Sequence, residues 1–174
     1  MAAPNKKPYQ TFAMVRRSLW SSERFRSLPS DSIRCLYLYF LTCTHLTGSG
    51  CFLLKEGYAL TDLAMTGATW SPTQCREAKT VLERSGMIQT DHKTAEILIT
   101  RWWAHNGPSN DSWFNGAQKM CAAIKSEELR QAAEKALEVC WQAYSAAKFP
   151  GSASRGESHD KAAQERMDAM RRKL

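Results

Sequence analysis

Hydrophobic side chains recur at helical spacing of three and four residues in three parts of the chain, each after a serine placed to cap a helix. The first is Pro29-Ser30-Asp31, where Ser30 or Asp31 can cap a helix over residues 31–44 with one broad apolar stripe. The second follows Ser71 and the third follows Ser126. The pattern therefore predicts a largely helical protein.

The richest local signals lie between residues 71 and 103. Ser71 can cap a helix, Pro72 suits its first position, and Gln74 completes a capping box. Gly86 is the expected left-handed stop. The inward arc of this helix is apolar and the opposite arc is polar and charged: Cys75, Ala78, Val81 and Leu82 against Thr73, Arg76, Glu77, Thr80 and Arg84.

Two short apolar runs follow this helix and predict a β-hairpin. The strands are expected over residues 87–90 and 96–103, with the turn at residues 91–94. Ile97 and Ile99 alternate with neighbours that would face the other side, as in a strand with one buried face.

An earlier strand and helix complete the unit. Residues 51–54 form a short apolar run, and Thr61-Asp62 is expected to cap a short helix with Leu63 and Met65 inward and Gly67 as its end. The order helix, strand, helix, helix, strand, strand is that of a winged helix-turn-helix. We therefore expect a mainly α (α+β) chain with a winged helix-turn-helix domain at residues 28–104.

The remaining segments flank this domain. We expect a basic N-terminal arm at residues 1–27, with a short strand or extended piece at residues 9–15. Residues 105–149 form a C-terminal helical extension, and residues 150–174 form a basic tail that includes a marginal helix.

Within the C-terminal extension, residues 104–116 look like a loop and residues 117–124 like a short helix. The helix after Ser126 has an alanine-rich apolar stripe that includes Ala133, Ala136 and Leu137. That stripe can dock on the rest of the chain or pair with a second copy in a homodimer. The pattern does not choose between the two.

Positive charge gathers at the ends of the chain. The net charge is +7, and residues 1–29 hold six Lys or Arg against Glu23 alone, whereas residues 30–149 are balanced. Such ends suit contact with phosphate, although basic tails can also serve solubility. Trp20 and Phe25 among these arginines could stack on bases, but pinning the arm to a core is the favoured interpretation.

Known catalytic and metal-binding patterns are missing from the sequence. It has no P-loop, dinucleotide fingerprint, nucleophile elbow or zinc-protease motif. Its six cysteines show no CxxC pair, so we expect free thiols and no metal. His105 is the one histidine in a polar, aromatic neighbourhood, and an ordinary loop histidine is favoured there over a catalytic one. We expect no enzyme activity and no cofactor.

No apolar run approaches the length of a membrane span, and the N-terminus lacks the apolar core of a signal peptide. We therefore expect a cytoplasmic protein that does not bind membrane.

Binding to double-stranded DNA is the function that these features favour. The helix after Ser71 would present short polar and cationic groups to the major groove, with Arg76 as the candidate for bidentate contact to guanine. The wing turn would follow a neighbouring phosphate or the minor groove, and the N-terminal arginines would add sequence-independent affinity. The candidate DNA-binding residues are Ser71, Thr73, Arg76, Glu77, Thr80, His92, Lys93, Arg16, Arg17, Arg24 and Arg26.

Four segments together resemble the N-terminal winged-helix domain of phage-encoded replication proteins of the replication-initiation or replisome-organiser type. They read SLWSSERFRSLPSDSIRCLYLYFLT, GCFLL, LERSGMIQTD and ILITRWWAHNGPSN, and the resemblance covers about residues 9–145. It implies a non-enzymatic protein of a bacterial host cell that binds origin DNA and recruits a replicative helicase or its loader. Such relatives usually carry a further C-terminal domain, in place of which this chain has helices and a basic tail.

Two other functions fit the same pattern. A winged helix can bind a protein partner, as a phage inhibitor of a host protein such as an anti-defence factor would. It can also regulate transcription. The helix after Ser71 is almost neutral, because Glu77 and Glu83 offset most of its cations, and this leaves the protein-binding alternative open.

Overall fold

The computed structural model describes residues 14–64 and 70–148. It is mainly helical with a small three-stranded antiparallel sheet, which agrees with the expected α+β class. In chain order the elements are η1 (Arg17–Ser21), α1 (Glu23–Arg26), α2 (Asp31–Thr42), β1 (Cys51–Leu53), α3 (Glu56–Ala64), α4 (Pro72–Arg84), β2 (Ile88–Asp91), β3 (Glu96–Ile99), α5 (Trp102–Asn106), α6 (Asp111–Ala122) and α7 (Glu127–Lys148).

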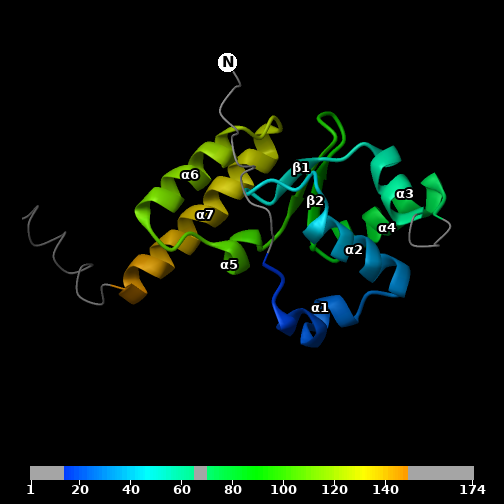
Figure 1. The fold of residues 1–174 in the computed structure, drawn as a ribbon, viewed down its shortest axis with the longest axis horizontal. Coiled ribbons are helices and arrows are strands. Elements are labelled where there is room, and N and C mark those ends of the chain that lie inside the picture. The colour runs from blue at the N-terminus through cyan, green and yellow to red at the C-terminus, as the bar shows by residue number, and fades with distance from the viewer. Residues whose placement is uncertain (1–13, 65–69, 149–174) are drawn as a thin grey trace, which may run out of the picture.

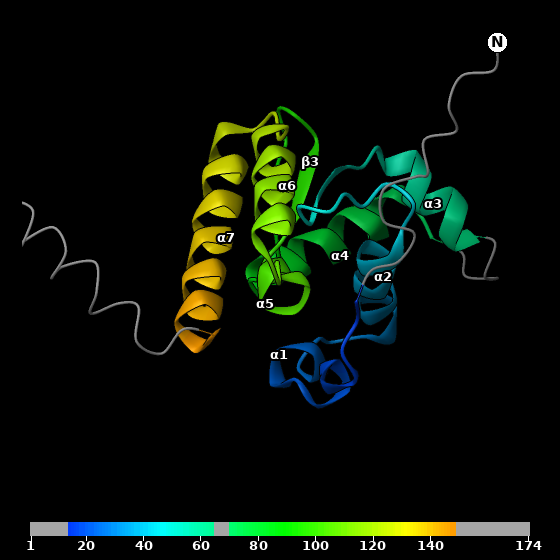
Figure 2. The ribbon, with the colours of Figure 1, turned by 60° about the vertical axis from the view of Figure 1, so that its left-hand side comes forward.

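The sheet lies between two groups of helices. Helices α2, α3 and α4 form one group, and α6 and α7 run side by side on the other side of the strands (Figures 1 and 2). The short elements η1 and α1 lie at one end of the first group. Apolar residues of both groups belong to one continuous core, which includes Phe40 and Leu82 from the first group and Leu129 and Leu137 from the second.

The ends of α2 and α4 follow the expected signals. The Ser30 side chain accepts a hydrogen bond from the backbone N–H of Ile33, so Ser30 is the cap of α2. Ser71 and Gln74 form the full capping box of α4. At the other end Gly86 has φ +64°, and the N–H groups of Gly86 and Met87 donate to Glu83 and Leu82 in a Schellman motif. This glycine turns the chain directly from α4 into β2.

The strand order is β1-β3-β2, with β3 antiparallel to both neighbours. Leu98 of β3 lies opposite Cys51 of β1 and Gln89 of β2. All four residues of β3 are buried, so the expectation of a half-buried strand is wrong. The reason is that α7 covers the face of the sheet that the hairpin pattern had left for solvent.

The second strand of the hairpin is also shorter than expected. It ends at Ile99, and Arg101 (φ 60°) turns the chain into α5, a helix in residues predicted as strand and loop. The buried indole of Trp102 donates to the Gly48 carbonyl at 2.8 Å. Residues 104–116 are therefore not one loop, since α6 already begins at Asp111, where the Asn110 side chain caps it.

Helix α3 also begins earlier than predicted. It starts at Glu56, which places Thr61 and Asp62 inside the helix and not at its cap. The Thr61 hydroxyl donates to the Gly57 carbonyl one turn back, at 2.8 Å. Leu63 is buried as expected, whereas the predicted end of this helix at residues 65–67 lies outside the described residues.

The described part of the N-terminal arm is helical. Phe25 and Leu28 are buried, which supports the interpretation that aromatic and aliphatic residues pin this segment to the core. Trp20 differs, because 65% of it is exposed while its ring meets the edge of Phe25 at 5.4 Å between centroids. Residues 9–13 and the basic tail at residues 150–174 lie outside the described residues.

Helix α7 uses its apolar stripe within the chain. Leu129, Ala133 and Leu137 are buried, and the indole N–H of Trp103 donates to the Ala133 carbonyl at 3.1 Å. A small side chain at 133 is what lets the indole reach the helix backbone. These three residues therefore pack against the rest of the chain. A homodimer formed through this helix stays a prediction.

In the described part of the chain, no helix is both long and apolar enough to span a bilayer.

Candidate nucleic-acid interface

A groove of about 350 Å³ separates α4 from the turn of the β-hairpin. Arg76 and Thr80 line it from α4, and His92 lines it from the turn, so the fold brings three of the predicted DNA-binding residues together. All three are exposed. We refer to this feature as the α4–turn groove.

The other predicted residues of α4 lie around its first turns. Thr73 and Glu77 are exposed but do not line the groove. The Arg76 guanidinium donates to the Thr73 hydroxyl at 3.4 Å, which draws the arginine along the helix surface. The Ser71 hydroxyl already accepts from the Gln74 N–H in the capping box, so its role at this end is to hold the helix terminus.

The turn owes its shape to Asp91. Its carboxylate accepts from the backbone N–H of Lys93 at 2.7 Å and of Thr94 at 3.4 Å. The Ser126 hydroxyl and then the Lys93 N–H lower the pKa of Asp91, since both favour the carboxylate. Lys93 is exposed at the tip and does not line the groove.

Two carboxylates on the groove wall connect secondary-structure elements. Glu83 of α4 accepts from both the N–H and the hydroxyl of Thr90 on β2, at 3.1 and 2.6 Å. Glu96 is buried and accepts from the N–H groups of Lys125 and Ser126 at the start of α7, at 3.0 and 2.7 Å. A carboxylate at a helix N-terminus is favoured by the unpaired amides and by the helix dipole. These contacts hold the hairpin rigidly against both α4 and α7.

Lys55 and Lys79 also line the groove, and sequence reasoning did not select either. Lys79 follows buried Ala78 on α4 and is half-buried. Its position on the helical wheel could therefore have identified it from the sequence. Lys55 follows β1, and only the pairing of β1 with β3 brings it beside the hairpin. With Arg76 they give three cations, against the three carboxylates Glu83, Asp91 and Glu96.

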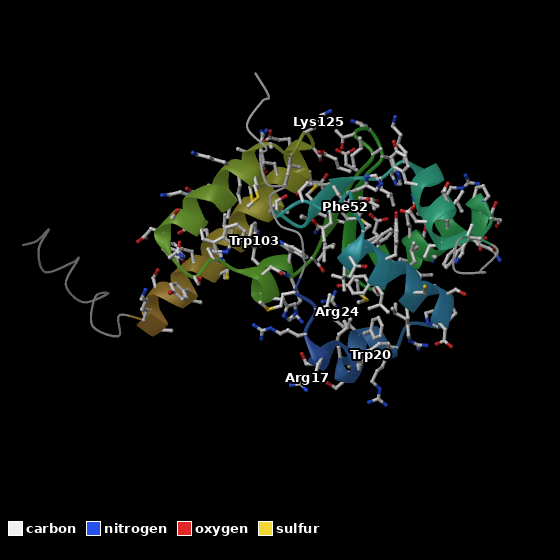
Figure 3. The ribbon with its side chains drawn as sticks, viewed as in Figure 1. Arg17, Trp20, Arg24, Phe52, Trp103 and Lys125 are labelled. Carbon is white, nitrogen blue, oxygen red and sulfur yellow. The ribbon has the colours of Figure 1, made fainter. Side chains whose placement is uncertain are left out.

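The four arginines of the N-terminal segment lie elsewhere. Figure 3 shows Lys125 at the top of the molecule and Arg17 at the bottom, with Arg24 above Arg17. The turn belongs to the Lys125 end, because the Lys125 N–H bonds to Glu96 at the start of β3. Arg16, Arg17 and Arg26 are exposed. The structure therefore does not bring the N-terminal arginines into the α4–turn groove.

Arg24 has a structural role that the sequence did not indicate. Its guanidinium donates to the carbonyls of Ser85, at 3.1 Å, and Gly86, where α4 ends. A cation there is favoured by the unpaired carbonyls of the last turn. Arg24 therefore ties the N-terminal segment to the junction of α4 and β2.

The cysteines in the described residues are free thiols. Burial, more than the nearby Glu96, raises the pKa of Cys51 to about 12, and burial raises that of Cys121 to about 12 as well. Such thiols stay protonated at neutral pH and act as small apolar side chains, whereas Cys35 is exposed. Within residues 14–64 and 70–148, no three His, Cys, Asp or Glu side chains form a group that could hold a metal ion.

Comparison with protein-family models, with curated proteins and with solved structures found no match in any of the three cases.

Proposed function

We propose that the unit from α2 to β3 is a winged helix-turn-helix that binds double-stranded DNA, with α4 as the recognition helix and the β2–β3 turn as the wing. Two features support this. The order of elements is helix, strand, helix, helix, strand, strand, and β2, an edge strand in the order β1-β3-β2, packs against α4. The role that fits is that of a phage or prophage protein acting in replication initiation or its control.

The observation that carries the proposal is the α4–turn groove itself. Arg76 and Thr80 of α4 face the same hollow as His92 of the turn. A helix and a flanking turn that share one cation-bearing groove can follow a major groove about 12 Å wide and the phosphates beside it. Lys55 and Lys79 add phosphate-binding groups on the same surface.

The carboxylates in this groove set the strength of binding. Each of Glu83, Asp91 and Glu96 has a role in holding the hairpin, yet each still carries negative charge beside the cations. Affinity from the groove alone is therefore expected to be modest. The N-terminal arginines would supply further, sequence-independent attraction to the DNA backbone.

Duplex binding by the full chain, followed by fluorescence anisotropy over a range of salt concentrations, tests this proposal. Arg76→Ala should reduce discrimination between preferred and random sequence by about 1–3 kcal/mol, because a base contact would be lost. The double variant Arg16→Ala/Arg17→Ala should weaken all sequences alike and reduce the salt slope by about two.

Arg130→Ala is the matched control. Arg130 lies on α7, where its guanidinium pairs with Glu127 in the same helix, and it lines neither wall of the groove. It should change neither specificity nor salt slope. Failure to detect duplex binding at low salt would overturn the DNA-binding proposal.

A second function is favoured by the charge balance of the groove. Three cations face three carboxylates there, and Leu54, Ala95 and Ile97 contribute apolar surface. A protein partner, such as a host protein that a phage inhibitor would block, also suits a surface that combines balanced charge with apolar side chains. This alternative predicts a co-purifying partner whose binding survives Arg16→Ala/Arg17→Ala and high salt. A transcriptional regulator, a helicase or loader partner and a homodimer remain open within the DNA-binding proposal.

A further inference from the structure

A second hollow, of about 180 Å³, lies under the N-terminal segment at the opposite end of the hairpin from the turn. Its floor is apolar and includes Leu41, Met87, Ile99 and Trp102. Four basic side chains line it as well, namely Arg16, Arg24, Arg101 and His105, and we call it the basic hollow. Arg24, labelled in Figure 3, belongs to α1 and lines the hollow from that side.

The described residues that line the basic hollow provide no negative charge to balance its cations. Among the described residues that line it, none is acidic. Neither Arg16 nor Arg101 forms an ion pair with another residue in the described part of the chain. Burial lowers the pKa of His105, and the positive charges of Arg16 and Arg101 lower it further.

Hydrogen bonds fix the Arg24 side chain and the backbone that carries the other cations. Arg24 is fixed by its bonds to the Ser85 and Gly86 carbonyls. Arg101 has a left-handed backbone (φ 60°), an uncommon and costly conformation for a residue with a Cβ. The Asn106 side chain accepts from the Met14 N–H at 3.0 Å, which attaches the chain just before Arg16 to α5. Arg24 therefore loses little freedom when an anion binds, whereas the exposed side chains of Arg16 and Arg101 become ordered on it.

We propose that the basic hollow binds a phosphate monoester with a planar or apolar body, with a nucleotide as the simplest example. Three guanidinium groups can donate paired hydrogen bonds to phosphate oxygens, and a dianion matches their charge better than a single carboxylate does. The body of the ligand would lie on the apolar floor beside Trp102. Burial raises the pKa of Tyr37, so its hydroxyl remains a neutral donor in the same wall. This site is separate from the α4–turn groove.

Isothermal titration of the full chain with AMP, adenosine and inorganic phosphate tests the proposal. AMP is expected to bind more tightly than inorganic phosphate, and adenosine at least about tenfold more weakly than AMP, because charge-assisted hydrogen bonds are lost. Equal binding of AMP and adenosine, or no binding of AMP, would overturn it.

Variants locate the site. Arg101→Asn removes the charge while asparagine tolerates the left-handed backbone, and Arg16→Gln removes a second charge. Each is expected to weaken AMP binding by about tenfold or more. Arg26→Gln is the matched control, because Arg26 is exposed on α1 and does not line the hollow. An equal loss in Arg26→Gln would mean that general positive charge, not the hollow, binds the nucleotide.

The phosphate monoester could be a free nucleotide or the 5′ end of a DNA strand. Competition between AMP and a short oligodeoxynucleotide, with and without a 5′-phosphate, separates these sources. Displacement of AMP by the 5′-phosphorylated strand alone indicates a strand end, and displacement by neither strand indicates the free nucleotide. Equal displacement by both strands would contradict recognition of a monoester.

Discussion

The α4–turn groove and the basic hollow are both lined by cations, but they differ in what balances those cations. In the groove, Lys55, Arg76 and Lys79 lie with three carboxylates that hold the hairpin in place. In the hollow no described lining residue is acidic. The cations of the groove are thus balanced by carboxylates, whereas no described lining residue balances the cations of the hollow.

This difference separates two ways of binding an anion. A nearly neutral groove depends on shape and on individual hydrogen bonds, so it is suited to choosing between ligands. A hollow with uncompensated arginines attracts any anion that fits, and its affinity should fall with salt. Substitutions that alter one region and spare the other test whether the two act independently.

The largest effect is expected from Gly50→Ala. Gly50 has φ +75°, and a Cβ there would come within 2.3 Å of Cγ of Trp102, the residue that lines the floor of the hollow. Left-handed strain and overpacking together should lower the free energy of unfolding by about 3 kcal/mol. The hollow should be disturbed more than the groove, so AMP binding should fall further than duplex binding.

Thermal melting measures this loss, and Gly57→Ala is its control. Gly57 lies in α3, and no atom would be within 4 Å of its added Cβ. Alanine inside a helix should raise stability by about 1 kcal/mol. A loss of stability in Gly57→Ala equal to that in Gly50→Ala would refute the packing argument at Trp102.

The next effect is expected from Glu96→Gln, on the groove side. An amide can accept from only one of the Lys125 and Ser126 N–H groups and turns its own N–H₂ toward the other. The loss should be about 1–3 kcal/mol, read from urea unfolding. Glu138→Gln is the control. Glu138 is exposed on α7, and its carboxylate accepts a hydrogen bond from the Gln142 side chain. A loss below about 0.5 kcal/mol in both variants would contradict the role of Glu96.

A smaller effect is expected from Asp91→Asn, which changes charge while it keeps the turn. The asparagine oxygen can still accept from Lys93 and Thr94, so the hairpin shape should persist. If the groove binds DNA, duplex affinity at low salt should rise about twofold to fivefold. Anisotropy measures this, and AMP affinity should stay unchanged. An equal rise for AMP would mean that the two regions share one electrostatic field.

The smallest effect concerns pH and His105. Its pKa is lowered in the folded protein by burial and by Arg16 and Arg101, so the unfolded chain binds this proton more readily. Stability should therefore fall as the pH drops through the ordinary histidine value of about 6.5. Urea midpoints at pH 7.5 and 5.5 should differ less in His105→Gln than in the unmodified chain. An equal difference in His105→Gln and in the unmodified chain would argue against His105 as its source.

Local signals predicted the elements whose ends depend on neighbouring residues. The cap at Ser30, the box of Ser71 with Gln74 and the stop at Gly86 are all hydrogen-bonded as expected. The first half of α6 was missed although Asn110 caps it, because a polar stretch with two glycines resembled a loop. No such signal in the sequence marked α5. The residue with the left-handed backbone just before it is Arg101, where a glycine would have been recognised as a turn.

The candidate site was predicted only in part. Arg76, Thr80 and His92 could be chosen because helix periodicity and the hairpin turn indicate which side chains are exposed. Lys55 could not, because it reaches the groove through the pairing of β1 with β3. Arg24 was selected for its charge, yet its guanidinium holds the end of α4, a contact between residues about sixty positions apart.

The sequence by itself determined the caps of α2 and α4, the hairpin and the order of elements from α2 to β3, because these rest on hydrogen bonds between residues a few positions apart and on apolar periodicity. The tertiary structure alone decided that α7 docks on the sheet and buries β3 on both faces. It also decided that Glu96 accepts hydrogen bonds from the backbone just before α7 and that Arg16, Arg101 and His105 line one hollow. These arrangements depend on contacts between residues far apart in the chain, and local patterns carry no information about which distant surfaces meet.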